Sequence, residues 1–149
     1  MVFIVVPRFN IATLITMIET IRIANYLAPT SIFSWEVASF DGSKIIASNG
    51  MTATIKTAND NLKPAEFVFI LGSWGTEHYH NQRLTAWLRK RARAGERICG
   101  VELGSYIAAR AGLLDGKSAT IHWSWLNGFK ENFDRVDAVS YTHLRAHET

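Results

Sequence analysis

The sequence predicts an α/β domain, a three-layer sandwich in which a mostly parallel β-sheet lies between two layers of helices. Short apolar runs alternate along the chain with longer stretches whose apolar residues recur at helical spacing. Strands that alternate with helices are joined by right-handed crossovers into a parallel sheet. The chain has 149 residues, of which 48% are hydrophobic and 19% charged, and this suits one domain with its own core.

The first two expected elements are a strand and a long helix. The strand is expected at 2–6, a β-branched and aromatic run closed by Pro7, which is typical of a buried strand. The helix is expected at 11–27, where apolar residues recur at helical spacing. Asn10 is its expected N-cap, and Pro29 lies just beyond its end.

A second strand and a hairpin follow. The strand is expected at 35–40, and the arms of the hairpin at 45–47 and 51–57. The arms flank Asn49-Gly50, a dipeptide that supplies the positive φ angles of a tight turn. Polar threonines alternate along the second arm, so we expect the hairpin at the periphery of the fold.

The middle of the chain predicts a strand, a helix and another strand. Residues 67–71 form a continuous apolar run that ends at Gly72, so we expect a central parallel strand covered on both faces. A helix at 81–94 stops at Gly95. A further buried strand is expected at 98–101.

A sharp turn after this strand is the most informative feature of the chain. Residues 100–123 predict a strand, a turn and a helix at 105–111. Such a turn lifts one side chain above the carboxyl edge of a sheet, where α/β proteins bind ligands and hydrolases place a nucleophile. Here the turn carries Glu102, not Ser or Cys. A last helix is expected at 123–133, although Gly128 lies inside it.

The composition argues against several kinds of site. Cys99 is the single cysteine, which excludes an internal disulfide and a cysteine-based zinc cluster, and we interpret it as a buried structural residue. His78 and His80 are two residues apart, a spacing at which side chains on a helix diverge, so we expect a hydrated loop and no metal. The sequence has no glycine-rich phosphate loop, and no cofactor is expected.

Charge and hydropathy set the expected surroundings of the protein. The net charge is +3, and much of the excess lies at 83–97, a run that is typical of a solvated helix face rather than a nucleic-acid interface. Its basic residues are Arg83, Arg89, Lys90, Arg91, Arg93 and Arg97. The apolar run at 2–7 is far shorter than the roughly 18 residues of a membrane span, and 1–8 do not form a signal peptide. We therefore expect a cytoplasmic protein with no membrane partner.

The final segment, VSYTHLRAHET at 139–149, breaks with the pattern before it. It resembles the translation of a common transposase-insertion sequencing adapter. We therefore divide the chain into a partial domain at 1–138 and an artefactual tail at 139–149. On this hypothesis His143 and His147 carry no function, although their spacing of four would suit metal ligands.

Three segments resemble the sensor half of GlxA-type regulators of the AraC family: VPRFNIATLITMIETIRIAN, FVFILGSWG and GVELGSYIAARAGLLDGKSATIHW. In that group a PfpI/ThiJ-like domain, with the flavodoxin-like fold of class I glutamine amidotransferases, precedes an AraC-type DNA-binding domain. The resemblance covers residues 1 to about 136. It implies that the fold is incomplete at its C-terminal end and that a helix-turn-helix domain is missing from this chain.

The resemblance also implies what stands at the turn. Catalytic members carry a cysteine where this chain has Glu102, followed here by Leu103-Gly104, and a glutamate early in the first helix where this chain has Thr13. A cysteine at the turn would be activated by the N-terminus of the following helix, whereas a carboxylate is a poor nucleophile toward acyl carbons. We therefore expect no catalytic residue here.

We predict a ligand pocket around the turn. Glu102 either points into it, with the loop amides near Gly72 and Ser73 completing a polar cup, or only caps the following helix. Trp74 either presents a face to a cation or packs in its loop. His122 either lines the pocket or is held by a backbone partner. The predicted ligand-binding residues are Gly72, Ser73, Trp74, Glu102, Leu103 and His122.

These observations favour a non-catalytic, small-molecule-sensing domain of a transcriptional regulator, dimeric when full length. A carboxylate in the pocket favours a cationic, amine-bearing effector, and DNA binding is expected only through the missing domain. Glu19 and Arg22 match the E-x-x-R pattern of the resembled group and are interpreted as a surface or interface pair. Two alternatives stay open: a PfpI/ThiJ-class hydrolase or glyoxalase-like enzyme, which needs a reactive thiol, and an interaction module without a pocket.

Overall fold

The structure, a computed structural model, describes residues 1–58 and 61–140. Its centre is a five-stranded sheet in the order β5-β2-β1-β6-β7, and every pair of neighbours is parallel. The strands are β1 Val2–Val5, β2 Glu36–Ser39, β5 Lys56–Thr57, β6 Phe67–Gly72 and β7 Arg97–Glu102. The buried strand β1 lies in the middle of the sheet because each of its four residues is apolar and can be covered on either face.

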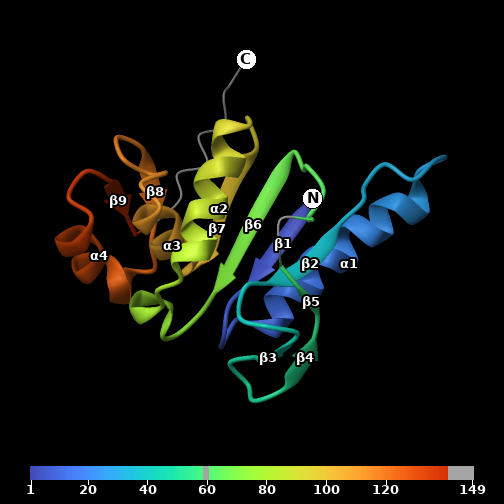
Figure 1. Cartoon of the computed structure of the whole chain (residues 1–149), viewed down its shortest axis with the longest axis horizontal. Coiled ribbons are helices and arrows are strands. Elements are labelled where there is room, and N and C mark those ends of the chain that lie inside the picture. The colour runs from blue at the N-terminus through green and yellow to red at the C-terminus, as the bar shows by residue number, and fades with distance from the viewer. Residues whose placement is uncertain (59–60, 141–149) are drawn as a thin grey trace.

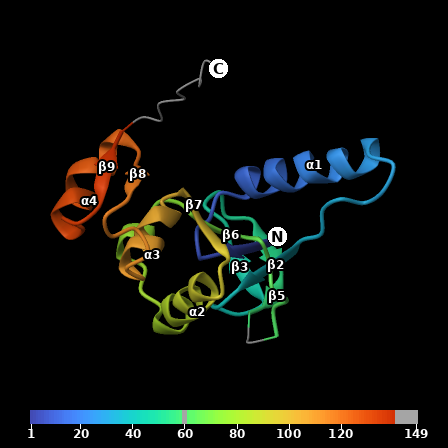
Figure 2. The ribbon, with the colours of Figure 1, turned by 90° about the horizontal axis from the view of Figure 1, so that it is seen from above.

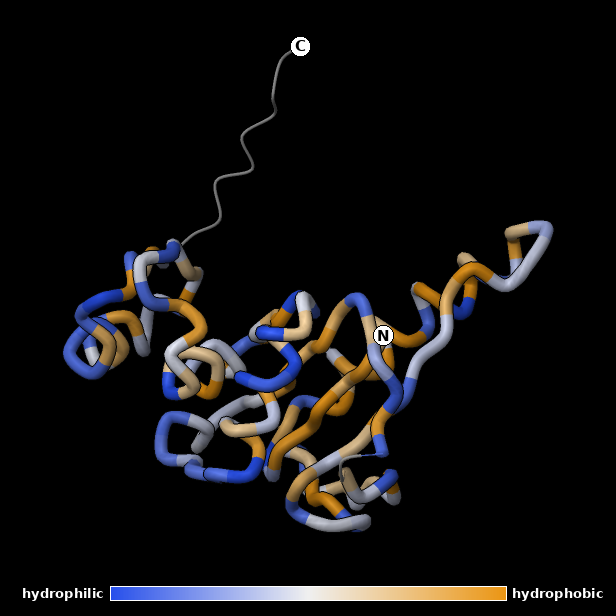
Figure 3. Tube along the Cα trace, turned by 45° about the horizontal axis from the view of Figure 1, so that its top comes forward, coloured by the Kyte–Doolittle hydropathy of each residue, from blue (hydrophilic) through white to orange (hydrophobic). Residues whose placement is uncertain are grey.

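Helices cover both faces of this sheet (Figure 2). Helix α1 (Ile11–Leu27) packs on one face, against a core cluster that contains Phe3 and Val5. Helices α2 (Gln82–Arg93) and α3 (Gly104–Arg110) pack on the other face, against a cluster that contains Val2 and Ile4. The predicted three-layer α/β sandwich is therefore confirmed, and Figure 3 shows the hydrophobic residues concentrated along its central strands.

Helix α1 has the predicted bounds, because its end signals are local. Asn10 is the N-cap, and its side chain accepts hydrogen bonds from the backbone N–H groups of Ala12 at 3.1 Å and Thr13 at 3.3 Å. The helix ends at Leu27, and the next residue, Ala28, is in an extended conformation. Ala28 directly precedes Pro29, which disfavours a helical conformation at that position.

The predicted hairpin forms, but its second arm is shorter than expected. Strands β3 (Lys44–Ile46) and β4 (Thr52–Thr54) pair antiparallel. The predicted arm at 51–57 breaks at Ile55, which packs into the core on the α1 side. Residues Lys56–Thr57 then join the central sheet as β5, and the next residue, Ala58, is buried on the opposite face. Because the segment leaves the hairpin and joins the central sheet, Ile55 packs on one face of the sheet and Ala58 on the other.

Strand β6 is central, but it is not covered on both faces as predicted. Phe67 and Phe69 are only half-buried, and their rings stack 6.0 Å apart, with Phe3 a further 5.2 Å from Phe69. Phe3 and Phe69 pack in the core cluster on the α1 side of the sheet. The partial exposure of Phe67 and Phe69 means that α1 does not reach across the β6–β7 half of this face.

The C-terminal part forms a small unit beside α3 (Figure 1). The predicted helix at 123–133 is instead a 3-10 turn η2 (Trp123–Trp125) followed by α4 (Leu126–Asn132). Strands β8 (Ser118–Thr120) and β9 (Asp137–Val139), which were not predicted, pair in parallel on either side of them. The unit has its own core around Phe129, which packs edge-on against Tyr106 of α3 at 4.9 Å.

Two further points concern the ends of the described chain. Val139 lies in β9 opposite Thr120, so the ordered pairing extends one residue into the segment interpreted as an adapter-derived tail. His143 and His147 lie outside the described residues. Among the helices of the described ranges, none has the length and apolar character required to cross a bilayer.

Candidate functional site

The predicted sharp turn is present between β7 and α3. Glu102 ends the strand with a φ of 51°, in the left-handed region that side-chain-bearing residues rarely adopt. Two glycines allow the close packing that the turn requires. A Cβ atom at Gly104 would lie 2.0 Å from the Ile70 carbonyl oxygen, and one at Gly100 would lie 2.6 Å from the Ser105 nitrogen. The helix therefore begins directly against the backbone of β6.

The Glu102 carboxylate is exposed and is held from the start of α1. Its Oε1 atom accepts hydrogen bonds from Asn10 Nδ2 at 3.0 Å and from Thr13 Oγ1 at 2.6 Å. None of the ion pairs between described residues involves this carboxylate. Thr13 thus lies against the turn, at the position where the resemblance implies a glutamate in catalytic members. Sequence reasoning assigned Asn10 only to the helix cap, because a contact between the start of α1 and the end of β7 leaves no local signal in the sequence.

A pocket of about 390 Å³ opens beside this carboxylate. It is lined by Ser73, Trp74, Glu102, Leu103, His122, Ser124 and Trp125. All the predicted site residues except Gly72 are therefore brought together. Gly72 is not part of this lining, and a Cβ atom at that position would come within 2.6 Å of Thr76 Oγ1. Ser124 and Trp125 were missed, although they directly follow the His122-Trp123 pair in the sequence.

The two aromatic candidates in the pocket are both accessible. The Trp74 side chain is 65% exposed, so it does not pack in its loop. His122 is also exposed, and its Nδ1 accepts a hydrogen bond from the Ser124 N–H at 3.2 Å. The neutral ring therefore carries its proton on Nε2, which stays available as a donor. A backbone partner therefore orients a His122 ring that lines the pocket.

The backbone at the turn differs from that of an oxyanion hole. In hydrolases with a nucleophile at such a turn, the N–H of the next residue stabilises the developing oxyanion. Here the Leu103 N–H donates to the Gly72 carbonyl oxygen at 3.2 Å. Gly72 is the residue opposite Glu102 in the β6–β7 pairing, so this bond continues the strand pairing by one residue beyond β7 and uses the Leu103 donor within the backbone.

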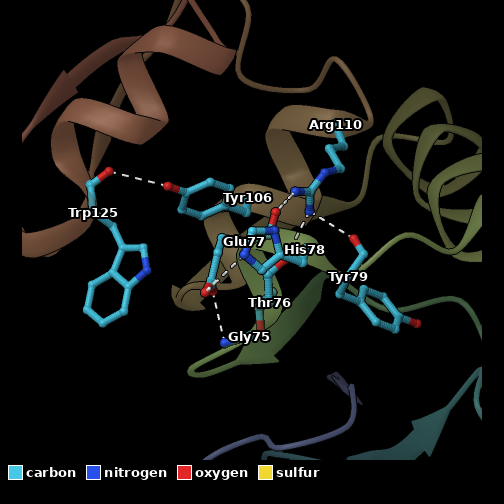
Figure 4. A network of polar contacts seen from close by, with 8 residues as sticks. All are labelled: Gly75, Thr76, Glu77, His78, Tyr79, Tyr106, Arg110 and Trp125. Atoms are coloured by element: carbon cyan, nitrogen blue, oxygen red, sulfur yellow. Dashed lines mark hydrogen bonds and ion pairs between the residues drawn. The ribbon is translucent and has the colours of Figure 1, made fainter.

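A larger groove of about 660 Å³ lies on the other side of Trp125, between η1 (Thr76–His78), α2, α3 and α4. Its floor is organised by Arg110 (Figure 4). The guanidinium donates to the carbonyl oxygens of Thr76 at 3.0 Å and Tyr79 at 2.9 Å, and also to that of Glu77. Burial lowers the pKa of Arg110 below its ordinary value. Because its donors are used within the fold, Arg110 acts as a brace for this segment.

The same segment corrects one prediction about histidines. His78 and His80 were expected in a hydrated loop, but His78 belongs to the 3-10 turn η1, which Arg110 fastens to α3. Both imidazoles are exposed. Within residues 1–58 and 61–140, no group of three His, Cys, Asp or Glu side chains is placed to hold a metal ion.

Cys99 is half-buried rather than buried, because β7 is an edge strand of the central sheet. Burial raises the pKa of its thiol, and the charge of nearby Arg97 opposes this to a smaller extent. The thiol is therefore less ionised at neutral pH than that of a free cysteine, and the reactive form for nucleophilic attack is the thiolate.

The basic face at 83–97 is only partly solvated, as Arg91 shows. Its side chain is buried, its Nε lies 2.7 Å from Glu96 Oε2, and it donates to the Leu62 carbonyl oxygen at 3.1 Å. Arg89 Nε donates to the Ala111 carbonyl oxygen at 2.9 Å and so ties α2 to the end of α3. Periodicity alone missed these roles, because the acceptors are carbonyl groups far away in the sequence.

The fold and the turn define a class of protein, a DJ-1/PfpI-type α/β domain. The DJ-1/PfpI family model matches residues 8–139, so the chain belongs to the DJ-1/PfpI family. This confirms the resemblance inferred from the three sequence segments.

The relatives within this family include transcriptional regulators. The HTH-type transcriptional regulator CdhR of Pseudomonas aeruginosa is 33% identical over 137 residues, which span 92% of this chain and 40% of CdhR. The HTH-type transcriptional regulator GlxA of Rhizobium meliloti is 27% identical over 136 residues, 91% of this chain and 42% of GlxA. The chain thus spans about two fifths of the length of these curated relatives.

A solved structure has the same fold. The AraC family transcriptional regulator from Pseudomonas putida superposes with a TM-score of 0.83 at 20% sequence identity, over 94% of this chain and 75% of that structure. About a quarter of that structure has no counterpart in this chain.

Proposed function

We propose that this chain is the small-molecule-sensing domain of an AraC-type transcriptional regulator and that the pocket beside Glu102 is its ligand site. The names of the curated relatives support this, since CdhR and GlxA are both HTH-type transcriptional regulators. The longer protein would contact DNA through a separate helix-turn-helix domain, act as a homodimer and work in the cytoplasm. Residues 139–149 would be the adapter-derived tail, and a native stop codon after Thr149 in the genomic locus would contradict that assignment.

The observation that carries the proposal is the carboxylate at the turn. Glu102 occupies the strained position at which related enzymes place a nucleophile, and its side chain lines the pocket. A carboxylate does not supply thiolate chemistry, and the Leu103 N–H that would serve an oxyanion is bonded to Gly72. These features support recognition of a ligand rather than covalent catalysis.

The chemistry of the pocket supports an amine-bearing ligand. The Glu102 Oε1 atom accepts two hydrogen bonds from α1, while no hydrogen bond between described residues uses Oε2. The exposed indole of Trp74 lies in the same lining, together with that of Trp125. A carboxylate attracts a cation, and an indole face adds about 0.5 to 2 kcal/mol to cation binding, depending on desolvation.

The test compares small organic cations with their neutral isosteres. We would screen pairs such as choline and 3,3-dimethylbutan-1-ol by thermal shift and then measure affinities by calorimetry. The amine is expected to bind more tightly than its neutral partner, because only the amine gains the charge interaction with Glu102.

Two variants make this test specific to the pocket. Glu102→Gln keeps the shape of the side chain and removes its charge, so the affinity for the amine should fall about tenfold or more. Glu66→Gln makes the same charge change on an exposed side chain at the opposite end of the sheet and should leave the affinity unchanged. Binding of acidic ligands only, with no effect of Glu102→Gln, would contradict the proposal.

A further inference from the structure

Arg8, in the loop between β1 and α1, has a backbone conformation that does not suit an arginine. Its φ is 64°, and within residues 1–58 and 61–140 Glu102 is the only other residue besides glycines with a positive φ. Glycine adopts this region without the steric cost that a Cβ atom brings. The Arg8 N–H donates to the Ile46 carbonyl oxygen at 2.8 Å, a bond that glycine would also make. The backbone therefore does not explain why an arginine stands here.

The Arg8 side chain reaches the loop that follows β6. A Cβ atom placed on Gly75 would lie 3.8 Å from both Cδ and Nη1 of Arg8. Gly75 directly follows Trp74, which lines the proposed ligand pocket. Arg8 itself lies outside the lining of that pocket. Its positive charge is thus next to one wall of the pocket.

The guanidinium of Arg8 is exposed and has no protein partner in the described part of the chain. None of the ion pairs or hydrogen bonds between described side chains uses it. The carboxylate of Glu77, close by in the β6 loop, accepts a hydrogen bond from the Gly75 N–H at 2.9 Å and lines the groove on the other side of Trp125. It does not neutralise Arg8.

Arg8 and Glu102 place opposite charges at the same edge of the sheet. Arg8 follows β1, Glu102 ends β7, and β6 lies between these two strands. This is the carboxyl edge, where α/β proteins bind ligands. Neighbouring strands are about 4.8 Å apart, so the ends of β1 and β7 are about 10 Å apart. The two residues share a strained backbone as well, and such strain is concentrated at ligand sites.

We propose that Arg8 is a ligand-binding residue of the Glu102 pocket and that its guanidinium binds a carboxylate on the same ligand whose amine binds Glu102. The ligand is then a zwitterion. Charged contacts of about 3 Å at each end leave about 4 to 5 Å between its two charges. Arginine suits this role because its planar N–H donors match the two oxygens of a carboxylate. The inference rests on the amine site in the proposed function and adds a second charge to it.

The experiment compares two amines that differ only in their second charge. Calorimetry on the full chain would measure the affinities of γ-aminobutyrate and its amide, γ-aminobutyramide. Both carry the ammonium group for Glu102, and only the acid carries a carboxylate, about 5 Å away when the chain is extended. We expect the acid to bind about tenfold more tightly than the amide, because only the acid gains a charge-assisted contact with Arg8.

Three variants assign this preference to Arg8. Arg8→Gln removes the charge, so the acid and the amide should bind equally, with the affinity for the amide unchanged. Arg8→Lys keeps the charge and should retain a preference for the acid. Arg93→Gln makes the same charge change at an exposed position in the last turn of α2, near the opposite edge of the sheet, and should leave both affinities unchanged.

The outcomes separate this inference from the proposed function. Equal affinities of the acid and the amide for the unmodified chain would overturn the role of Arg8 and leave the amine site in place, and this comparison needs no variant to fold. A preference for the acid that persists in Arg8→Gln would overturn it too, as would choline binding without binding of either probe. A chain that binds none of these amines would overturn the proposed pocket as well.

Discussion

The strained backbone at Glu102 predicts that glycine is more stable than alanine at this position, which is the reverse of the usual order. Both Glu102→Gly and Glu102→Ala remove the carboxylate and its bonds to Asn10 and Thr13, so the difference between the two variants isolates the backbone. At a φ of 51°, a residue with a side chain loses about 1 to 2 kcal/mol relative to glycine. The greater freedom of glycine in the unfolded chain opposes this by about 0.4 to 1 kcal/mol. Glu102→Gly should therefore be more stable than Glu102→Ala by about 0.5 to 1 kcal/mol.

Urea unfolding followed by tryptophan fluorescence measures this difference, and the chain has five tryptophans. For a domain of this size the difference corresponds to a melting-temperature gap of about 2 °C. Ala86→Gly, at an exposed position within α2, is the matched control, and there glycine should lower stability by about 1 kcal/mol. If Glu102→Gly were less stable than Glu102→Ala, as at the control position, the argument that the turn is strained would be refuted.

Two further predictions concern the same strand and helix. Gly104→Ala would place a Cβ atom 2.0 Å from the Ile70 carbonyl oxygen. The free energy of unfolding should therefore fall by about 3 kcal/mol, which is at the upper end of the cost of overpacking. A loss below about 0.5 kcal/mol in urea unfolding would contradict the close approach of the two backbones. Burial raises the pKa of the Cys99 thiol, so the thiolate fraction at neutral pH is reduced. Iodoacetamide should therefore label the folded chain more slowly at pH 7 than it labels glutathione. The labelling rate should still rise above pH 9. Fast labelling that levels off below pH 7 would instead favour the enzyme alternative.

The elements that sequence reasoning located well have signals within a few residues of their ends. Asn10 and Pro29 fix α1, and a capping Asn81, whose side chain accepts from the Leu84 N–H at 3.1 Å, fixes the start of α2. The strands β8 and β9 have only three residues each, too short for alternation to be distinguished from a loop. Their pairing depends on the packing of Phe129 against α3, which no local pattern indicates.

The site could be predicted because parallel strands end at one edge. Glu102 follows β7 and Ser73 follows β6, and these strands are neighbours in the sheet, so their loops meet. Trp125 could not be predicted in the same way, because it enters from the C-terminal unit, whose position is set by contacts such as the hydrogen bond from Tyr106 Oη to its carbonyl oxygen at 3.3 Å. The position of Trp125 in the pocket therefore depends on long-range packing, whereas the positions of Glu102 and Ser73 follow from the order of the strands.

The position of Glu102 also bears on why a carboxylate stands there. Glycine would relieve the backbone strain, so a glutamate at this φ lowers stability unless its side chain contributes elsewhere. Its bonds to Asn10 and Thr13 offset part of that loss, but they use only Oε1 and tie an exposed group to other exposed groups, an arrangement that contributes little net stability in water. Structural gain alone therefore does not account for the residue. The proposed recognition of a cation through Oε2 would account for it, because a carboxylate that is already oriented binds a ligand without first losing its own conformational freedom.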